Sequence, residues 1–127
     1  MTVLVTGGAG YIGSHMTLEL ADRGDKIVVL DNLSTGVRAQ VAEVATFVQG
    51  DIRDSALVRD VLKKHDVEAV IHFAGSIVVP ESVENPLREE SNNTAAAREL
   101  IESCVASGVK KFSWCSSAAV YGVTDKP

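Results

Sequence analysis

The chain has little of what marks membrane, secreted or nucleic-acid-binding proteins. No apolar run approaches the roughly 20 residues that a membrane-spanning helix needs. No basic segment with a cleavage site precedes the first apolar stretch, so we expect no signal peptide. The formal net charge of −5 argues against a nucleic-acid-binding surface. These absences favour a cytoplasmic protein whose partners are neither nucleic acids nor membranes.

Cysteine is also scarce, with Cys104 and Cys115 the only two in 127 residues. Both lie within apolar patterns, which predicts two reduced and buried side chains of the kind usual in cytosolic proteins. No Cys or His spacing suggests a metal site, so we expect none. With 46% hydrophobic residues, the chain is sufficient for one globular domain with a substantial core.

Glycine, in contrast, is concentrated near the start, in the segment VLVTGGAGYIGSH of residues 3–15. Residues 2–6 are predicted to form a buried strand and residues 10–23 a helix that Gly24 ends. Gly7 precedes the spacing Gly8-x-Gly10-x-x-Gly13, which is typical of a dinucleotide-binding turn. There, glycines permit a tight turn, close approach of backbone N–H groups to a pyrophosphate, and tight packing of helix on strand. The alternative is a glycine-rich turn that binds nothing.

Asp31 ends the next apolar run, Lys26–Asp31, 18 positions after Gly13. A carboxylate at this place can accept both ribose hydroxyls of an adenosine and would repel a 2′-phosphate. The sequence therefore favours NAD over NADP. The alternative role for Asp31 is to cap its own loop.

The remaining chain continues the alternation of strands and helices. Right-handed crossovers then give an α/β fold of Rossmann type, a doubly wound parallel sheet of about five strands in the order 3-2-1-4-5. A cofactor is expected across the crevice between the first and fourth strands. Further strands are predicted over residues 46–49, 68–73 and 110–115, and helices over 55–65 and 87–107, with a weak helix over 37–43.

Three polar positions outside the glycine motif have competing interpretations. Asp51 follows the third strand, where ligands of such sheets bind, although it could cap the next helix, as Asp54 or Ser55 also could. His72 lies in an apolar strand and is interpreted as a hydrogen-bonded core residue, not a catalytic base. Ser117 follows the fifth strand, where a hydroxyl fits a substrate contact, the start of a proton relay or a simple turn equally well.

Taken together, these motifs resemble those of the UDP-glucose 4-epimerase family, within the extended short-chain dehydrogenase/reductase superfamily. The resemblance covers almost the whole chain. The matching segments are TGGAGYIGSH from residue 6, DNLS from 31, GDIR from 50, HFAG from 72, ESV from 81, Asn92-Asn93 and SSAAVYG from 116. It implies that NAD stays bound while hydride leaves C4 of a UDP-hexose and returns to the other face.

The resemblance also implies roles for individual residues. Pyrophosphate contacts are expected from the glycine turn with Tyr11 and Ile12. Contacts to the adenosine ribose and its loop are expected from Asp31, Asn32, Leu33 and Ser34, and adenine contacts from Asp51 and Ile52. The wall near the dinucleotide is expected from Phe73, Ala74, Gly75 and Asn92. Ser117 matches the hydroxyl that bonds to the sugar O4.

The chain departs from the family pattern in three places. The family base is a tyrosine in a Tyr-x-x-x-Lys helix, and this motif is absent from the 127 residues. Ile77 stands where the family often has lysine. Glu89 and Glu90 stand where aromatic residues are usual, on a helix that the family buries in its dimer, so the oligomeric state is left open.

Residues 1–127 are accordingly expected to be an incomplete NAD-binding domain, truncated after the fifth strand and without a sugar-binding domain. We expect the chain to bind NAD but not to epimerise, and to bind a UDP-sugar only with the missing half present. Two alternatives remain. One is a truncated nucleotide-sugar dehydratase or reductase of the same superfamily, and the other is a non-catalytic dinucleotide-binding or scaffold module.

Overall fold

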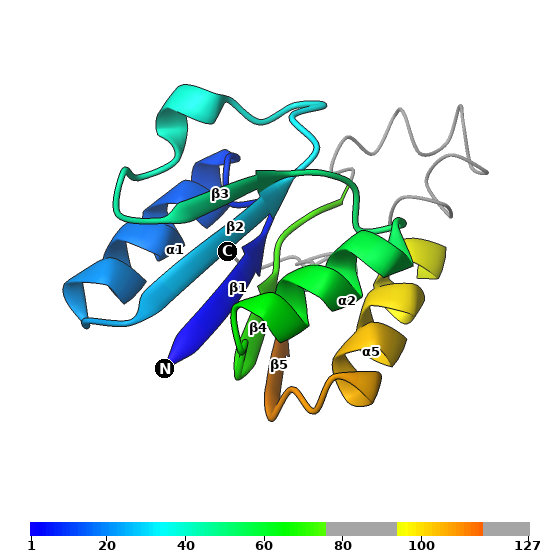
Figure 1. The fold of residues 1–127 in the computed structure, drawn as a ribbon. Helices are drawn as coiled ribbons and strands as arrows, with labels where there is room; N and C mark the ends of the chain where they lie inside the picture. The colour runs from blue at the N-terminus through cyan, green and yellow to red at the C-terminus, as the bar shows by residue number, and fades with distance from the viewer. Residues whose placement is uncertain (76–93, 116–127) are drawn as a thin grey trace, which may run out of the picture.

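The structure is a computed structural model that describes residues 1–75 and 94–115. Its elements alternate strand and helix along the chain, close to the predicted ranges (Figure 1). In order they are β1 (Thr2–Thr6), α1 (Tyr11–Asp22), β2 (Lys26–Asp31), the 3-10 helix η1 (Arg38–Gln40), β3 (Thr46–Gln49), α2 (Ser55–Lys64), β4 (Ala69–His72), α5 (Ala96–Ala106) and β5 (Lys111–Trp114).

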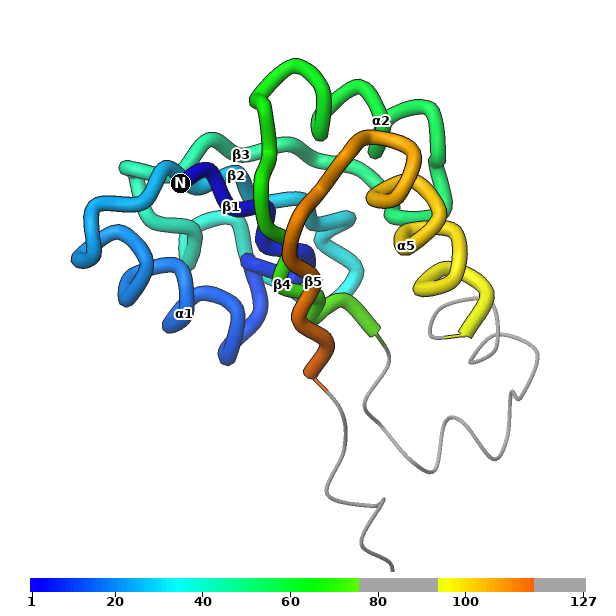
Figure 2. The backbone as a smooth tube through the Cα atoms, turned by 90° about the horizontal axis from the view of Figure 1, so that it is seen from below, coloured from blue at the N-terminus to red at the C-terminus, as the bar shows by residue number. Residues whose placement is uncertain are grey.

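The five strands form one sheet in the order β3-β2-β1-β4-β5, which confirms the predicted topology. Every pair is parallel, so the carboxyl ends of all strands lie at one edge. Helix α1 covers one face, and α2 and α5 lie side by side on the other (Figures 1 and 2). The order reverses between β1 and β4, and ligands of such sheets bind at this point.

Alternating side chains of the strands fill two cores. Leu4, Val28 and Val70 face α2 and α5, whereas Val5 and Val29 face α1. All five side chains are almost completely buried. Because both faces of the central strands are covered, their sequences read as continuous apolar runs.

The helix ends follow from local chemistry. Asp54 caps α2 by accepting a hydrogen bond from the Leu57 N–H at 3.2 Å. Gly24 and Gly108 follow α1 and α5 with positive φ angles of 87° and 73°, the conformation in which glycine commonly ends a helix.

Three sequence predictions were wrong. The weak helix over residues 37–43 is only the single turn of η1. Cys115 is exposed, because it lies just beyond β5 at the sheet edge, whereas Cys104 is buried as predicted. Helical spacing predicts a buried stripe of Ala97, Leu100, Ile101, Cys104 and Val105 on α5, but Ile101 and Val105 are 36% and 76% exposed. The buried arc of that helix is rotated toward its small residues, which fit against α2 and the sheet: Ala96, Ala97 and Ser103 are buried with Leu100 and Cys104. The predicted first part of this helix, residues 87–93, lies outside the described residues.

Candidate functional site

The glycine turn occupies the carboxyl edge of the sheet between β1 and α1. Gly7 has a positive φ of 71°, and a Cβ there would lie 2.7 Å from the Ala74 nitrogen and 2.9 Å from the Phe73 carbonyl carbon. A Cβ on Gly13 would overlap the carbonyl group of Gly7. These positions therefore need glycine because the main chain leaving β4 and the first turn of α1 both touch the loop.

The N-terminus of α1 is open to an anion. Within the described residues, no side chain caps it, Gly10 is its N-cap, and its first turn holds no acidic residue. The N–H groups and positive dipole end of a helix favour phosphate at such a place. Tyr11 and Ile12 form the start of this helix and are 76% and 58% exposed.

Asp31 connects the end of β2 to the glycine turn. Its Oδ2 accepts a hydrogen bond from the Ala9 N–H at 3.0 Å, and its Oδ1 accepts one from the Leu33 N–H at 2.8 Å. The residue is 8% exposed. Each carboxylate oxygen retains a lone pair, so Asp31 is a fixed acceptor beside the turn.

The loop after β2 closes over the glycine turn, which sequence reasoning missed. The Val37 N–H donates to the Ala9 carbonyl at 3.0 Å. A Cβ on Gly36 would lie 2.9 Å from the Ala9 Cβ and 3.0 Å from the Asp31 Oδ2. The available signal was the glycine five positions after the acid, within a turn-rich loop.

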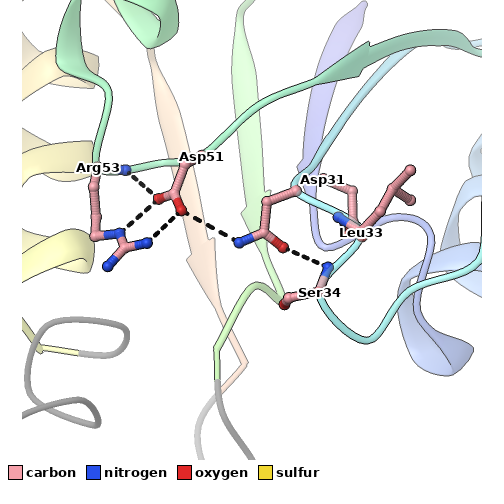
Figure 3. Close-up of polar contacts among 6 residues, drawn as sticks. Asp31, Leu33, Ser34, Asp51 and Arg53 are labelled. Carbon is pink, nitrogen blue, oxygen red and sulfur yellow. Dashed lines mark hydrogen bonds and ion pairs between the residues drawn. The ribbon is translucent and has the colours of Figure 1, made fainter.

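Asp51 follows β3 on the same edge and is held by a dense set of donors (Figure 3). Arg53 donates to it from its backbone N–H and its guanidinium, and the Asn32 amide donates at 3.3 Å. The same Asn32 accepts the Ser34 N–H at 3.0 Å. The bonds from Arg53 hold the pKa of Asp51 at about 2, below its ordinary value.

The side chains of the neighbouring residues Asp51 and Ile52 have different surroundings. Asp51 does not cap α2, because Asp54 does so. Ile52 is 6% exposed and belongs to the core under α2 and α5. Its side chain serves the core, which leaves its main chain for any contact with a base.

The segment that leaves β4 lies against the glycine turn. The Phe73 N–H donates to the Thr6 carbonyl at 3.0 Å. The Ala74 N–H donates to Thr6 Oγ1 at 3.3 Å, and that hydroxyl also pairs with His72. Burial lowers the pKa of His72 to about 4, so the ring is neutral near pH 7. It is a hydrogen-bonded core residue, as its sequence context predicted. The two candidates Asn92 and Ser117 lie outside the described residues, as do Ile77, Glu89 and Glu90.

In residues 1–75 and 94–115, no group of three or more His, Cys, Asp and Glu side chains is placed to hold a metal ion. No helix in the described part of the chain is long and apolar enough to cross a bilayer.

A glycine turn at the reversal point of a parallel 3-2-1-4-5 sheet, with an acid ending the second strand, defines the Rossmann class of fold. Comparison with known families is more specific. The model of the NAD dependent epimerase/dehydratase family matches residues 3–127, and the chain belongs to this family.

Its relatives point the same way. The chain is 49% identical to UDP-glucose 4-epimerase of Azospirillum brasilense over 97% of its own length and 35% of the relative's. It is 46% identical to a Klebsiella pneumoniae protein of that name over 100% of its own length and 95% of the relative's. The crystal structure of the Brucella ovis UDP-glucose 4-epimerase in complex with NAD superposes with a TM-score of 0.93 at 43% identity, over 98% of this chain and 38% of that one. The predicted relationship to these epimerases is confirmed, and the chain spans only 35% and 38% of the length of the Azospirillum brasilense and Brucella ovis proteins.

Proposed function

We propose that this chain binds NAD across the carboxyl edge of its sheet, as the dinucleotide-binding part of a UDP-hexose 4-epimerase. The pyrophosphate would lie at the N-terminus of α1, the adenosine ribose at Asp31 and the nicotinamide toward the crevice between β1 and β4. NAD supplies the hydride acceptor in such a reaction, and the described residues bind and orient it.

The observation that carries this proposal is the fixing of Asp31. Its carboxylate is held by one N–H from the glycine turn and one from its own loop. Ribose hydroxyls can donate to the lone pairs that remain, whereas a 2′-phosphate would meet a fixed negative charge. The alternative of a purely loop-capping Asp31 explains the Leu33 bond but not the bond to the glycine turn.

We propose the remaining contacts from the family resemblance and the positions of the other residues. Gly7, Gly10 and Gly13 would shape the turn, and the N–H groups of Tyr11 and Ile12 at the start of α1 would donate to the pyrophosphate. Asn32, Leu33 and Ser34 flank the ribose, Asp51 with the main chain of Ile52 takes the adenine, and Phe73, Ala74 and Gly75 form the wall. The family resemblance adds Asn92 near the dinucleotide and Ser117 at the sugar O4.

Epimerisation is favoured over dehydration or reduction, because the relatives at 46–49% identity are named UDP-glucose 4-epimerase. The general base of that reaction would lie on a Tyr-x-x-x-Lys motif, which these 127 residues do not contain. We therefore expect these residues alone to bind NAD and to leave a UDP-hexose unchanged.

Calorimetric titration with NAD and with NADP tests the proposal. We expect NAD to bind at least about tenfold more tightly than NADP, because like charges at close range repel strongly. Asp31→Ala should abolish this preference. Asp31→Asn, which keeps an acceptor for the glycine turn, should reduce it in a chain whose circular dichroism shows it to be folded.

Asp60→Ala is the matched control, because it removes one carboxylate from the exposed surface of α2. It should leave both affinities unchanged. Absence of NAD binding in a folded chain, or equal binding of NAD and NADP, would contradict the proposal.

A further inference from the structure

The Asp51 carboxylate is unusually well supplied with donors for a partly exposed side chain. Its Oδ1 accepts the backbone N–H and the Nε of Arg53, both at 2.9 Å. Its Oδ2 accepts Nη2 of Arg53 at 2.7 Å and the Asn32 amide at 3.3 Å. Three of the four bonds therefore come from one residue (Figure 3).

Such an arrangement fixes orientation as well as charge. A guanidinium presents two parallel N–H groups to a carboxylate, which sets the plane of the carboxylate as a single point charge does not. The backbone N–H of the same residue adds a third direction. Asp51 follows β3 in a loop, where an unsupported carboxylate would rotate freely about its side-chain torsions.

The remaining donor indicates where a ligand approaches. The Asn32 amide makes the longest of the four bonds and reaches Asp51 from the loop after β2, where the adenosine ribose is expected. An exocyclic amino group on a base has the same N–H chemistry as this amide. It can replace or share that bond without disturbing the Arg53 pair.

We propose that Arg53 is a positioning residue for base recognition, which holds the Asp51 carboxylate so that the site selects a base with an amino group over one with a carbonyl oxygen. This rests on the NAD-binding function proposed above. An ionised carboxylate only accepts hydrogen bonds, so it pairs with the amino group of adenine. The carbonyl oxygen of hypoxanthine would place lone pairs against it and leave both groups unsatisfied.

The charges around Asp51 agree with this role. The bonds from Arg53 lower the pKa of Asp51, so the Asp51 carboxylate is ionised at neutral pH. The neighbouring acids have other partners: Asp31 accepts from the Ala9 and Leu33 N–H groups, and Asp54 from the N–H of Leu57.

The test compares binding of NAD and of nicotinamide hypoxanthine dinucleotide to the 127-residue chain by calorimetry at pH 7. The unaltered chain should prefer NAD by about tenfold, the effect of one lost hydrogen bond and one unsatisfied group. Arg53→Ala should reduce this preference to about threefold or less. Arg53→Lys keeps the charge but not the bidentate geometry, so its preference for NAD should lie between those of the unaltered chain and Arg53→Ala.

Three further measurements separate this proposal from its alternatives. Asp51→Asn can turn an amide N–H toward the base, so it should remove or reverse the preference. Arg98→Ala removes an arginine whose side chain is 81% exposed on α5 and paired with Glu102, and it should change nothing. The preference for NAD over NADP should survive in Arg53→Ala, because Asp31 is intact.

The outcomes distinguish the two proposals. If the unaltered chain binds no NAD, the proposed function fails. If it binds NAD but Arg53→Ala weakens NAD and its hypoxanthine analogue by the same factor, Arg53 is only a stabilising residue and this inference is wrong. An unaltered chain that binds both dinucleotides equally would also overturn it.

Discussion

The hydroxyl of Thr6 lies 2.6 Å from Nδ1 of His72, at the point where β1 and β4 end side by side. Both residues are almost completely buried, and the same hydroxyl accepts the Ala74 N–H. A buried polar group thus joins the two strands between which the nicotinamide is expected. It also holds the exit from β4 against the glycine turn.

Replacement of this hydroxyl should destabilise the fold. Thr6→Val has nearly the same shape but leaves the His72 ring nitrogen and the Ala74 N–H without their partner. We expect the free energy of unfolding to fall by about 1–3 kcal/mol, the cost of an unsatisfied buried group. Urea denaturation followed by circular dichroism measures this. Thr6→Ser keeps the hydroxyl and should lose less, and an equal loss in the two variants would contradict the assignment.

Stability should also depend on pH through His72. Its pKa is about 4 in the folded chain and 6.5 when unfolded, so the unfolded chain binds more protons between these values. The contribution of neutral His72 to the free energy of unfolding is therefore fully present above pH 6.5. It is lost as the pH drops toward 4, which lowers the free energy of unfolding by about 3 kcal/mol. Asp51, with its pKa of about 2, adds a further loss only below pH 4.

Urea denaturation at intervals between pH 7 and pH 4 measures the slope. His72→Asn keeps a hydrogen-bonding side chain without a titrating ring, so its profile should be flatter whatever its stability at pH 7. A parallel slope in that variant would assign the pH dependence to other groups.

Much of this fold follows from local sequence. The apolar run that ends at Asp31 is typical of a strand covered on both faces, and right-handed crossovers then favour the observed sheet order. Gly24 and Gly108 end helices for a local reason, their φ angles. The position of Asp31 at the carboxyl edge follows from the same pattern.

What could not be predicted depends on contacts between distant segments. The bond from Ala9 to Asp31 and the fit of Gly36 between them require the loop after β2 to fold back over the turn. The exposure of Ile101 and Val105 depends on how α5 is rotated about its axis against α2. Helical periodicity predicts an apolar face, but it does not fix which edge of that face is buried. Arg53 was visible as the last residue of the GDIR segment, two positions after an acid, but its bonds to the Asp51 carboxylate were not predicted.

The glycine turn offers a controlled test of close packing. Gly7 and Gly24 both have positive φ angles, but a Cβ on Gly24 meets nothing within 4 Å, whereas one on Gly7 meets the main chain of Phe73 and Ala74. Gly24→Ala should therefore cost only the backbone strain, about 1–2 kcal/mol. Gly7→Ala should cost clearly more and should weaken NAD binding. Thermal or urea unfolding measures the loss of stability in each variant. Equal losses would show that the main chain of Phe73 and Ala74 moves aside at little cost.

The two cysteines should differ in reactivity. Cys104 is 4% exposed, and burial raises the pKa of its thiol to about 11, so very little thiolate is present at pH 8. Cys115 is exposed at the end of β5. Iodoacetamide at pH 8 should therefore label Cys115 first in the native chain, and both cysteines in urea, as peptide mass spectrometry would show. In Cys115→Ser, slow labelling of Cys104 should follow the opening of α5 from the sheet and should quicken with added denaturant. Because Cys104 lies in the same core as Leu4 and Val70, labelling at the rate of Cys115 would mean that α5 is not held against that core in solution.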